Sequence, residues 1–290
     1  MKRLMILCVL AFVLCGCSPQ AEPADLAATT LPVYEFTSRQ CEGTGLTVTR
    51  LVTEEVSCLH DYSLNVRQVK AAEAAESIVI SGAGLEEFME DILSDSQRID
   101  ASGGIALLCP EEEHGHDHSH EGHHHENDPH IWLSPANASR MAANICTGLT
   151  VQYPEHADTF ANNLSILQDE LEELQEYGNA ALSDLACREL ITFHDGFSYF
   201  AQSFGLTIVE AVEEESGSEA SAKELIHLIE EVAHHNLPAI FTERSGSTSA
   251  ADIISRETGC KVFALDMAMA GESYFQAMYH NIDTIKEALQ

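Results

Sequence analysis

Residues 154–184 decide the fold, and they read PEHADTFANNLSILQDELEELQEYGNAALSD. Apolar residues recur in this stretch at alternating spacings of four and three, with acidic residues between them: Phe160, Leu164, Leu167, Leu171 and Leu174. This period is typical of an amphipathic helix, because residues three and four apart share one helix face. We expect one helix of about 25 residues, roughly 37 Å long at 1.5 Å per residue. A helix of that length can join two lobes as a stiff strut.

Both flanks of this helix alternate short apolar runs with helical patterns. On the N-terminal side we expect strands at 27–34, 46–52 and 77–81, a helix at 84–93, and a further apolar run at 104–108. On the C-terminal side we expect strands at 189–193, 207–211, 239–242 and 261–265, and helices at 195–204, 221–235, 249–258 and 274–289. Alternation of this kind is typical of βα units. The sequence therefore predicts an α/β fold of two βα lobes with parallel-type sheets, joined by one long rigid helix.

The N-terminus has the order of residues found in a secretory leader. Lys2 and Arg3 precede an apolar stretch at 4–14, which is shorter than the roughly 20 residues of a membrane span. The following Leu-Cys-Gly-Cys at 14–17 resembles the lipobox of bacterial lipoproteins, and Cys17 matches the cysteine that becomes lipidated there. We expect an extracytoplasmic chain anchored to the bacterial cell membrane through Cys17. An ordinary cleaved signal with incidental cysteines is the alternative.

Composition and pattern together divide the chain and limit its partners. We expect a signal peptide at 1–17, a tether at 18–27, an N-terminal lobe at 28–152, a linking helix at 153–184 and a C-terminal lobe at 185–290. The formal net charge is -33 at pH 7. Such a charge repels nucleic acid and raises the local concentration of cations. Nucleic acid is therefore excluded as a partner, and a cation ligand is favoured.

The cysteines beyond the leader permit disulfides but define none. There are six of them in an exported chain: Cys41, Cys58, Cys109, Cys146, Cys187 and Cys260. None forms a C-x-x-C pair, so a cysteine-type zinc site is not indicated. Cys187 and Cys260 each lie just before an expected strand of the C-terminal lobe. A bridge between them is expected if those strands are neighbours, and the other pairings stay open.

A histidine-rich loop at 111–127 is low in complexity, with the sequence EEEHGHDHSHEGHHHE at 111–126. It cannot form an apolar face, so we expect a flexible, solvated loop. Imidazole is a favoured ligand of Zn²⁺, Cu²⁺ and Ni²⁺, and seven histidines are expected to contact metal here: His114, His116, His118, His120, His123, His124 and His125. Residues 120–124 match the H-E-x-x-H pattern of metalloproteases by chance, since no helical period surrounds them.

Four isolated positions are stronger candidates for a defined metal site: His60, His130, His194 and Asp266. His194 and Asp266 end expected strands, and ligands of open α/β sheets bind beyond the carboxyl ends of strands. Three imidazoles and one carboxylate would complete a tetrahedral shell for Zn²⁺, with Zn–N distances of about 2.0–2.1 Å. Their spacing in the sequence does not by itself distinguish them from surface histidines.

Taken together, these segments resemble the metal-binding solute-binding proteins of ABC importers, the ZnuA/TroA-like cluster. The resemblance extends over about residues 28–289 and is most specific where the histidine-rich loop is followed by Asp-Pro-His-Ile-Trp-Leu at 128–133. The other matching segments are TTLPVY at 29–34, LHDYSL at 59–64, GAGLE at 82–86, FHD at 193–195, IFTE at 240–243 and VFALD at 262–266.

The resemblance implies a metal site in the interlobe cleft, with His60 and His130 from the first lobe and His194 and Asp266 from the second. A histidine at the third position and a histidine-rich loop indicate the zinc branch, whereas relatives with a carboxylate there tend to handle manganese. The implied function is capture of Zn²⁺ and its delivery to an ABC permease and its ATPase. The implied protein is a monomer and not an enzyme.

Two departures from the family pattern leave alternatives open. Glu-Ala-Ser stands at 219–221 in place of Glu-Pro-Ser, and Met-Ala-Met stands at 267–269 in place of Pro-Leu-Gly. Without that proline the turn that aims Asp266 is less constrained, so Glu243 or a water could complete the metal shell instead. A manganese or iron importer subunit, a zinc-dependent hydrolase and a metal-storage protein are the alternative functions.

Overall fold

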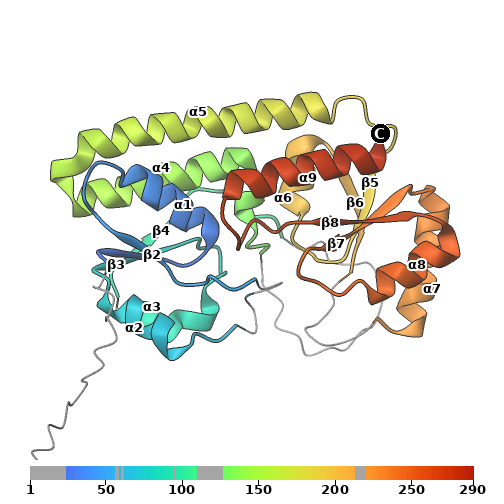
Figure 1. The fold of residues 1–290 in the computed structure, drawn as a ribbon, viewed down its shortest axis with the longest axis horizontal. Helices are drawn as coiled ribbons and strands as arrows, with labels where there is room; N and C mark the ends of the chain where they lie inside the picture. The colour runs from blue at the N-terminus through green and yellow to red at the C-terminus, as the bar shows by residue number, and fades with distance from the viewer. Residues whose placement is uncertain (1–23, 56–58, 60–61, 95, 110–126, 213–219) are drawn as a thin grey trace, which may run out of the picture.

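A computed structural model describes residues 24–55, 59, 62–94, 96–109, 127–212 and 220–290. Within these ranges the chain forms two lobes, each built on a parallel sheet, and one long helix, α5 (Ala157–Ala181), runs along both of them (Figure 1). The predicted α/β fold of two lobes joined by a long helix is confirmed. None of the helices in these ranges has both the length and the apolar character that crossing a bilayer requires.

The sheet of the N-terminal lobe has the strand order β2-β1-β3-β4, with every pairing parallel. Its strands are β1 (Leu26–Ala28), β2 (Val48–Arg50), β3 (Ser77–Ile80) and β4 (Arg98–Asp100). Its helices are α1 (Leu31–Gln40), α2 (Val66–Ala74), α3 (Glu90–Leu93) and α4 (Pro135–Gln152), with 3₁₀ turns at Glu87–Met89 and Ile131–Leu133. The central strands β1 and β3 are buried at every residue, as is usual for a parallel sheet covered on both faces.

Several expected boundaries in this lobe are wrong. The strand expected at 27–34 ends at Ala28, because Pro32 stands in the first turn of α1, where its fixed φ favours a helix start. The helix expected at 84–93 begins only at Glu87, as a 3₁₀ turn. The apolar run at 104–108 lies outside the sheet, and the fourth strand is Arg98–Asp100 instead.

The C-terminal lobe follows the expected order closely. Its sheet has the strand order β6-β5-β7-β8, again parallel throughout. The strands are β5 (Glu189–Thr192), β6 (Thr207–Ala211), β7 (Ala239–Glu243) and β8 (Lys261–Leu265), and the helices are α6 (Ser198–Phe204), α7 (Ala222–His235), α8 (Ser249–Thr258) and α9 (Tyr274–Leu289). A reciprocal capping box between Ser221 and Glu224 fixes the start of α7.

The expected bridge between Cys187 and Cys260 is not formed. Both are free thiols, and the strands that follow them, β5 and β8, are separated by β7. Adjacent strands lie about 4.8 Å apart, so strands two places apart exceed the roughly 7 Å limit for Cα atoms that a disulfide can join. Of the other described cysteines, Cys41, Cys109 and Cys146 are also free, and Cys58 lies outside the described residues.

Helix α5 connects the lobes through the apolar face that its sequence predicted. Phe160, Leu167, Leu171 and Leu174 are buried, and α5 contacts α1 and α4 in the first lobe and α6 and α9 in the second. Gly178 allows the close approach of α6, because a Cβ there would lie 2.2 Å from a ring carbon of Phe204. The largest apolar cluster includes residues of both lobes. The two lobes therefore share one continuous core.

Candidate metal centre between the lobes

His130 is held by the segment that precedes α4. The turn Asp128-Pro129-His130 leads into the 3₁₀ turn Ile131–Leu133, and the His130 side chain is buried. Asp128 Oδ1 accepts a hydrogen bond from the His130 backbone N–H at 2.9 Å and lies 2.8 Å from His130 Nδ1. A carboxylate at Nδ1 keeps the proton on that nitrogen and fixes the ring. The lone pair of His130 is therefore on Nε2, which points away from Asp128.

His194 is positioned by the sheet of the other lobe. It follows β5, and Glu243 ends the neighbouring strand β7, so the carboxyl ends of two parallel strands bring these side chains together. Glu243 Oε1 lies 3.2 Å from His194 Nδ1, and the Glu243 side chain is 4% exposed. Glu243 therefore lies on the Nδ1 side of the His194 ring, and Nε2 faces His130.

The Nε2 atoms of the two imidazoles face each other across the lobes. His130 Nε2 and His194 Nε2 are 3.3 Å apart, with ring centroids 5.1 Å apart and planes at 83°. Two nitrogens bound to one tetrahedral Zn²⁺ at about 2.0–2.1 Å would be about 3.3–3.4 Å apart. The pair therefore fits a metal ion without rearrangement.

The carboxylate of Asp266, just beyond the end of β8, is engaged by a cation of the protein. Asp266 Oδ2 accepts from Arg244 Nη1 at 3.0 Å, and the Arg244 side chain is 59% exposed. Asp266 and Glu243 line a pocket of about 60 Å³ that Glu55 of the first lobe also reaches. Arg244 therefore competes with a metal ion for this carboxylate.

The turn after Asp266 is fixed by hydrogen bonds and not by a proline. Asp266 Oδ1 accepts from the backbone N–H of Ala268 at 2.8 Å, and the Asn281 amide bonds both backbone groups of Asp266 at 2.7 Å. Trp132 Nε1 donates to the carbonyl of Met267 at 2.7 Å, which ties this turn to the segment that carries His130. Ala268 has a φ of 53°, a conformation that L-residues rarely adopt. The turn is thus tightly held without the family's usual proline.

The remaining predicted site residues lie outside the described residues. They are His60, the lipidation candidate Cys17, and the seven loop histidines His114, His116, His118, His120, His123, His124 and His125. The structure adds two residues to which the sequence reading gave no role, Asp128 and Arg244. The spacing Asp-x-His at 128–130 was the only signal for the first, because it places a carboxylate within reach of the ring. Nothing in the sequence pointed to Arg244.

Comparisons with known proteins place the chain among zinc-uptake proteins. A family model described as "Zinc-uptake complex component A periplasmic" (ZnuA) matches residues 26–288. The zinc-binding lipoprotein AdcA of Streptococcus pneumoniae is 31% identical over 99% of this chain, and the chain spans 61% of that relative's length. A crystal structure of ZnuA superimposes with a TM-score of 0.77 at 28% identity, covering 91% of this chain and 99% of the other. The structure of Zn(II)-bound AdcA from Streptococcus pneumoniae superimposes with a TM-score of 0.76 at 27% identity. The match covers 92% of this chain and 58% of the other.

Proposed function

The chain belongs to the ZnuA family, and on that premise we propose that it captures Zn²⁺ outside the cytoplasm and delivers it to an ABC permease and its ATPase. The observation that carries the proposal is the 3.3 Å separation of His130 Nε2 and His194 Nε2. Relatives named as zinc-binding lipoproteins, and solved relatives with Zn(II) bound, support zinc as the cargo.

The ligand chemistry favours zinc over manganese. Imidazole nitrogen suits Zn²⁺, whereas Mn²⁺ prefers carboxylate, carbonyl and water oxygens. We assign His130 and His194 as two ligands, His60 as the third and Asp266 as the fourth. Glu243 is an orienting partner in this arrangement, because it contacts Nδ1 of His194 and not the Nε2 that faces His130. Because its ligands are mainly imidazoles, the site supports the function of an iron or manganese importer subunit less well than that of a zinc importer subunit.

A transport role also accounts for the closed ligand set. Catalytic zinc keeps one position open for water or substrate, whereas four protein ligands leave none. With Asp266 bound, no position remains at which a water could be activated for hydrolysis. We therefore propose a binding protein and not an enzyme, and binding and release of the ion are its only chemistry.

Location and partners follow from the same proposal. Lipidation of Cys17 would tether a monomeric chain to the outer face of the membrane, close to the permease that receives the metal. The lobes at 28–152 and 185–290 would enclose the ion, and the helix at 153–184 would fix their spacing. The histidines of the loop at 111–127 would gather Zn²⁺ near the cleft.

X-ray absorption at the zinc edge tests the ligand set directly. Residues 18–290, loaded with one equivalent of Zn²⁺, should give a four-coordinate nitrogen and oxygen shell at about 2.0–2.1 Å with imidazole scattering. His130→Ala should reduce the imidazole contribution, and His227→Ala, in an exposed histidine of α7, should leave it unchanged. Sulfur in the shell, or a His130→Ala spectrum identical to that of the wild type, would overturn the assignment.

A further inference from the structure

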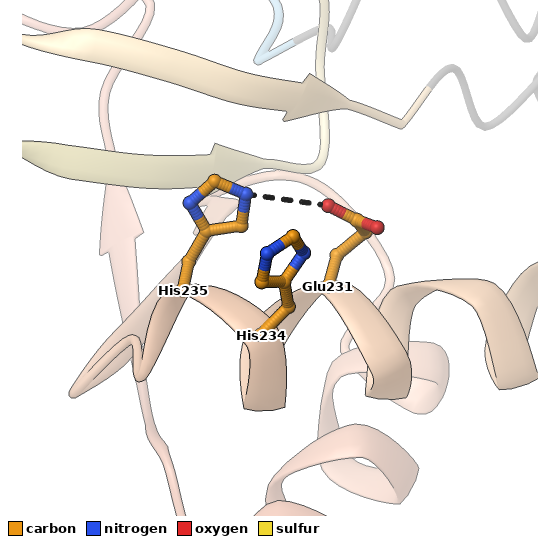
Figure 2. Close-up of side chains that lie close together, drawn as sticks. All are labelled: Glu231, His234 and His235. Carbon is orange, nitrogen blue, oxygen red and sulfur yellow. Dashed lines mark ion pairs between the residues drawn. The ribbon is translucent and has the colours of Figure 1, made fainter.

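Three side chains at the C-terminal end of α7 form a second group with metal-ligand chemistry. Glu231, His234 and His235 each offer one ligand atom, and the three atoms lie within 4.8 Å of one another (Figure 2). The sequence pattern assigned this stretch only to a helix. The spacings of three and four residues from Glu231 explain the grouping, because such residues share one helix face.

This group is separate from the interlobe site. His235 contacts Glu189, the first residue of β5, whereas His194 lies just beyond the other end of the same strand. Strand β5 has four residues and spans about 13 Å at 3.3 Å per residue, so the two histidine sites lie at opposite ends of this strand. One ion cannot contact both.

The two ring nitrogens of His235 have different partners. His235 Nδ1 lies 3.0 Å from Glu189 Oε2, and His235 Nε2 lies 3.4 Å from Glu231 Oε2. The shorter contact, at Nδ1, favours the proton there, as Asp128 does for His130, and Nε2 faces Glu231. An imidazole Nε2 beside a carboxylate oxygen, about one ligand-to-ligand distance away, is the beginning of a metal shell.

His234 supplies the third ligand from the exposed side. Its ring centroid lies 4.9 Å from that of His235, and its side chain is exposed, so a small rotation can close the remaining distance to the shared ion. Glu231 and His235 are about three-quarters buried, which limits their own movement. Two firmly placed ligands and one adjustable ligand suit a site that binds and releases its ion readily.

The local electrostatics also favour a cation. The C-terminus of a helix carries the negative end of its dipole, and α7 ends at His235. The carboxylates of Glu189 and Glu231 flank the ring of His235. Two imidazoles and a carboxylate suit Zn²⁺ and its neighbours Ni²⁺ and Cu²⁺, whereas Ca²⁺ and Mg²⁺ require oxygen ligands.

We propose that Glu231, His234 and His235 form a second Zn²⁺ site, with a water as the fourth ligand and Glu189 orienting His235. The site binds Zn²⁺ more weakly than the interlobe site, because it has three protein ligands and lies at the surface. The second lobe would therefore carry a zinc-binding site that does not depend on the histidine-rich loop. The other role for these residues is a set of ion pairs that stabilises the end of α7.

Anomalous diffraction at the zinc edge separates these two roles. Crystals of residues 18–290 soaked in Zn²⁺ should show a peak about 2.0–2.2 Å from His235 Nε2 and a Glu231 carboxylate oxygen. No peak there, in crystals that show one between His130 and His194, would overturn the second site while leaving the proposed function intact. A missing interlobe peak would instead count against the proposed function.

Counting bound zinc at fixed free Zn²⁺ gives the matching test in solution. The His235→Gln and His234→Gln variants should each lose one equivalent relative to wild type, and His227→Gln on the same helix should lose none. The Glu189→Gln variant should still bind this zinc ion, but with an affinity lower by about 10- to 100-fold, because it has lost only an orienting partner. An unchanged zinc count in His235→Gln, whatever its melting temperature, would show that these residues serve the helix end alone.

Discussion

His130 Nε2 and His194 Nε2 lie 3.3 Å apart although they belong to different lobes and are 64 positions apart in the chain. A carboxylate of the same lobe lies at the Nδ1 of each ring, Asp128 at 2.8 Å from His130 and Glu243 at 3.2 Å from His194. Because the rings are already placed, little ordering of side chains opposes metal capture, and preorganisation of this kind raises affinity.

Loss of an orienting carboxylate should weaken zinc binding without removing a ligand. Asp128→Asn retains the size of the side chain but weakens the hold on His130 Nδ1, so the affinity for Zn²⁺ should fall by about 10- to 100-fold. Competition titration against a zinc chelator measures this. Asp91→Asn, in an exposed residue of α3, is the control and should have no effect. Equal affinities for Asp128→Asn and wild type would mean that Asp128 does not support the site.

Release of Asp266 from its ion pair should strengthen zinc binding. Arg244 is largely exposed, and pairs of this kind are worth about 0.2–1 kcal/mol, so Arg244→Gln should raise the affinity by up to about fivefold. Asp266→Asn should lower it much further, because a ligand is lost. The same competition titration reports both changes. If neither substitution changes the affinity, a water and not Asp266 completes the shell.

Buried Glu86 should make stability depend on pH. Burial raises the pKa of its carboxyl from 4.5 to about 7, although Thr29, Ser81 and Gly82 donate hydrogen bonds to it. Between these two pH values the folded chain holds a proton that the unfolded chain has lost. The contribution to stability is therefore fully present below pH 4.5 and is lost as the pH rises through about 7, with a slope of up to about 1.4 kcal/mol per pH unit.

Urea unfolding of the metal-free chain at pH 5 and pH 7.5 measures this effect. The free energy of unfolding should fall less steeply with pH in Glu86→Gln than in the wild type, because the amide does not titrate. Glu90→Gln, in an exposed neighbour at the start of α3, should keep the wild-type slope. A Glu86→Gln slope equal to that of the wild type would show that the pKa of Glu86 is not raised.

The histidine-rich loop should add capacity for zinc and not tight affinity. Deleting residues 112–126 should lower the number of bound Zn²⁺ ions but leave the affinity of the tight site within about a factor of two, as expected for independent sites. Calorimetric titration gives both quantities in one experiment. Complete loss of tight binding on deletion would place the essential ligands in the loop.

The sequence predicted the second lobe better than the first, for physical reasons. Strands such as β8 have five residues and are followed by long amphipathic helices, so the local pattern is strong. The first lobe has three-residue strands, β1, β2 and β4, which are too short to show a period. Their positions depend on burial against the rest of the lobe, which no local window contains.

The site shows the same division between local and long-range information. His130 and His194 were identified from short motifs, yet their separation of 3.3 Å depends on how the two lobes pack. The ion pair of Arg244 with Asp266 joins the loops after β7 and β8, and the sequence gives no sign of it. The proposed bridge between Cys187 and Cys260 was wrong because it depended on a strand order that the sequence does not encode locally.

The measurement that tests the central claim most directly is a competition titration of metal-free residues 18–290 with Zn²⁺ and Mn²⁺. Wild type, His194→Ala and the control His227→Ala would be compared. We predict one tight zinc site and weak manganese binding in wild type and control. In His194→Ala the zinc affinity should fall by more than about 100-fold, beyond the effect of losing an orienting contact. Tight zinc binding that survives in His194→Ala would contradict the assignment of the metal to the space between the lobes.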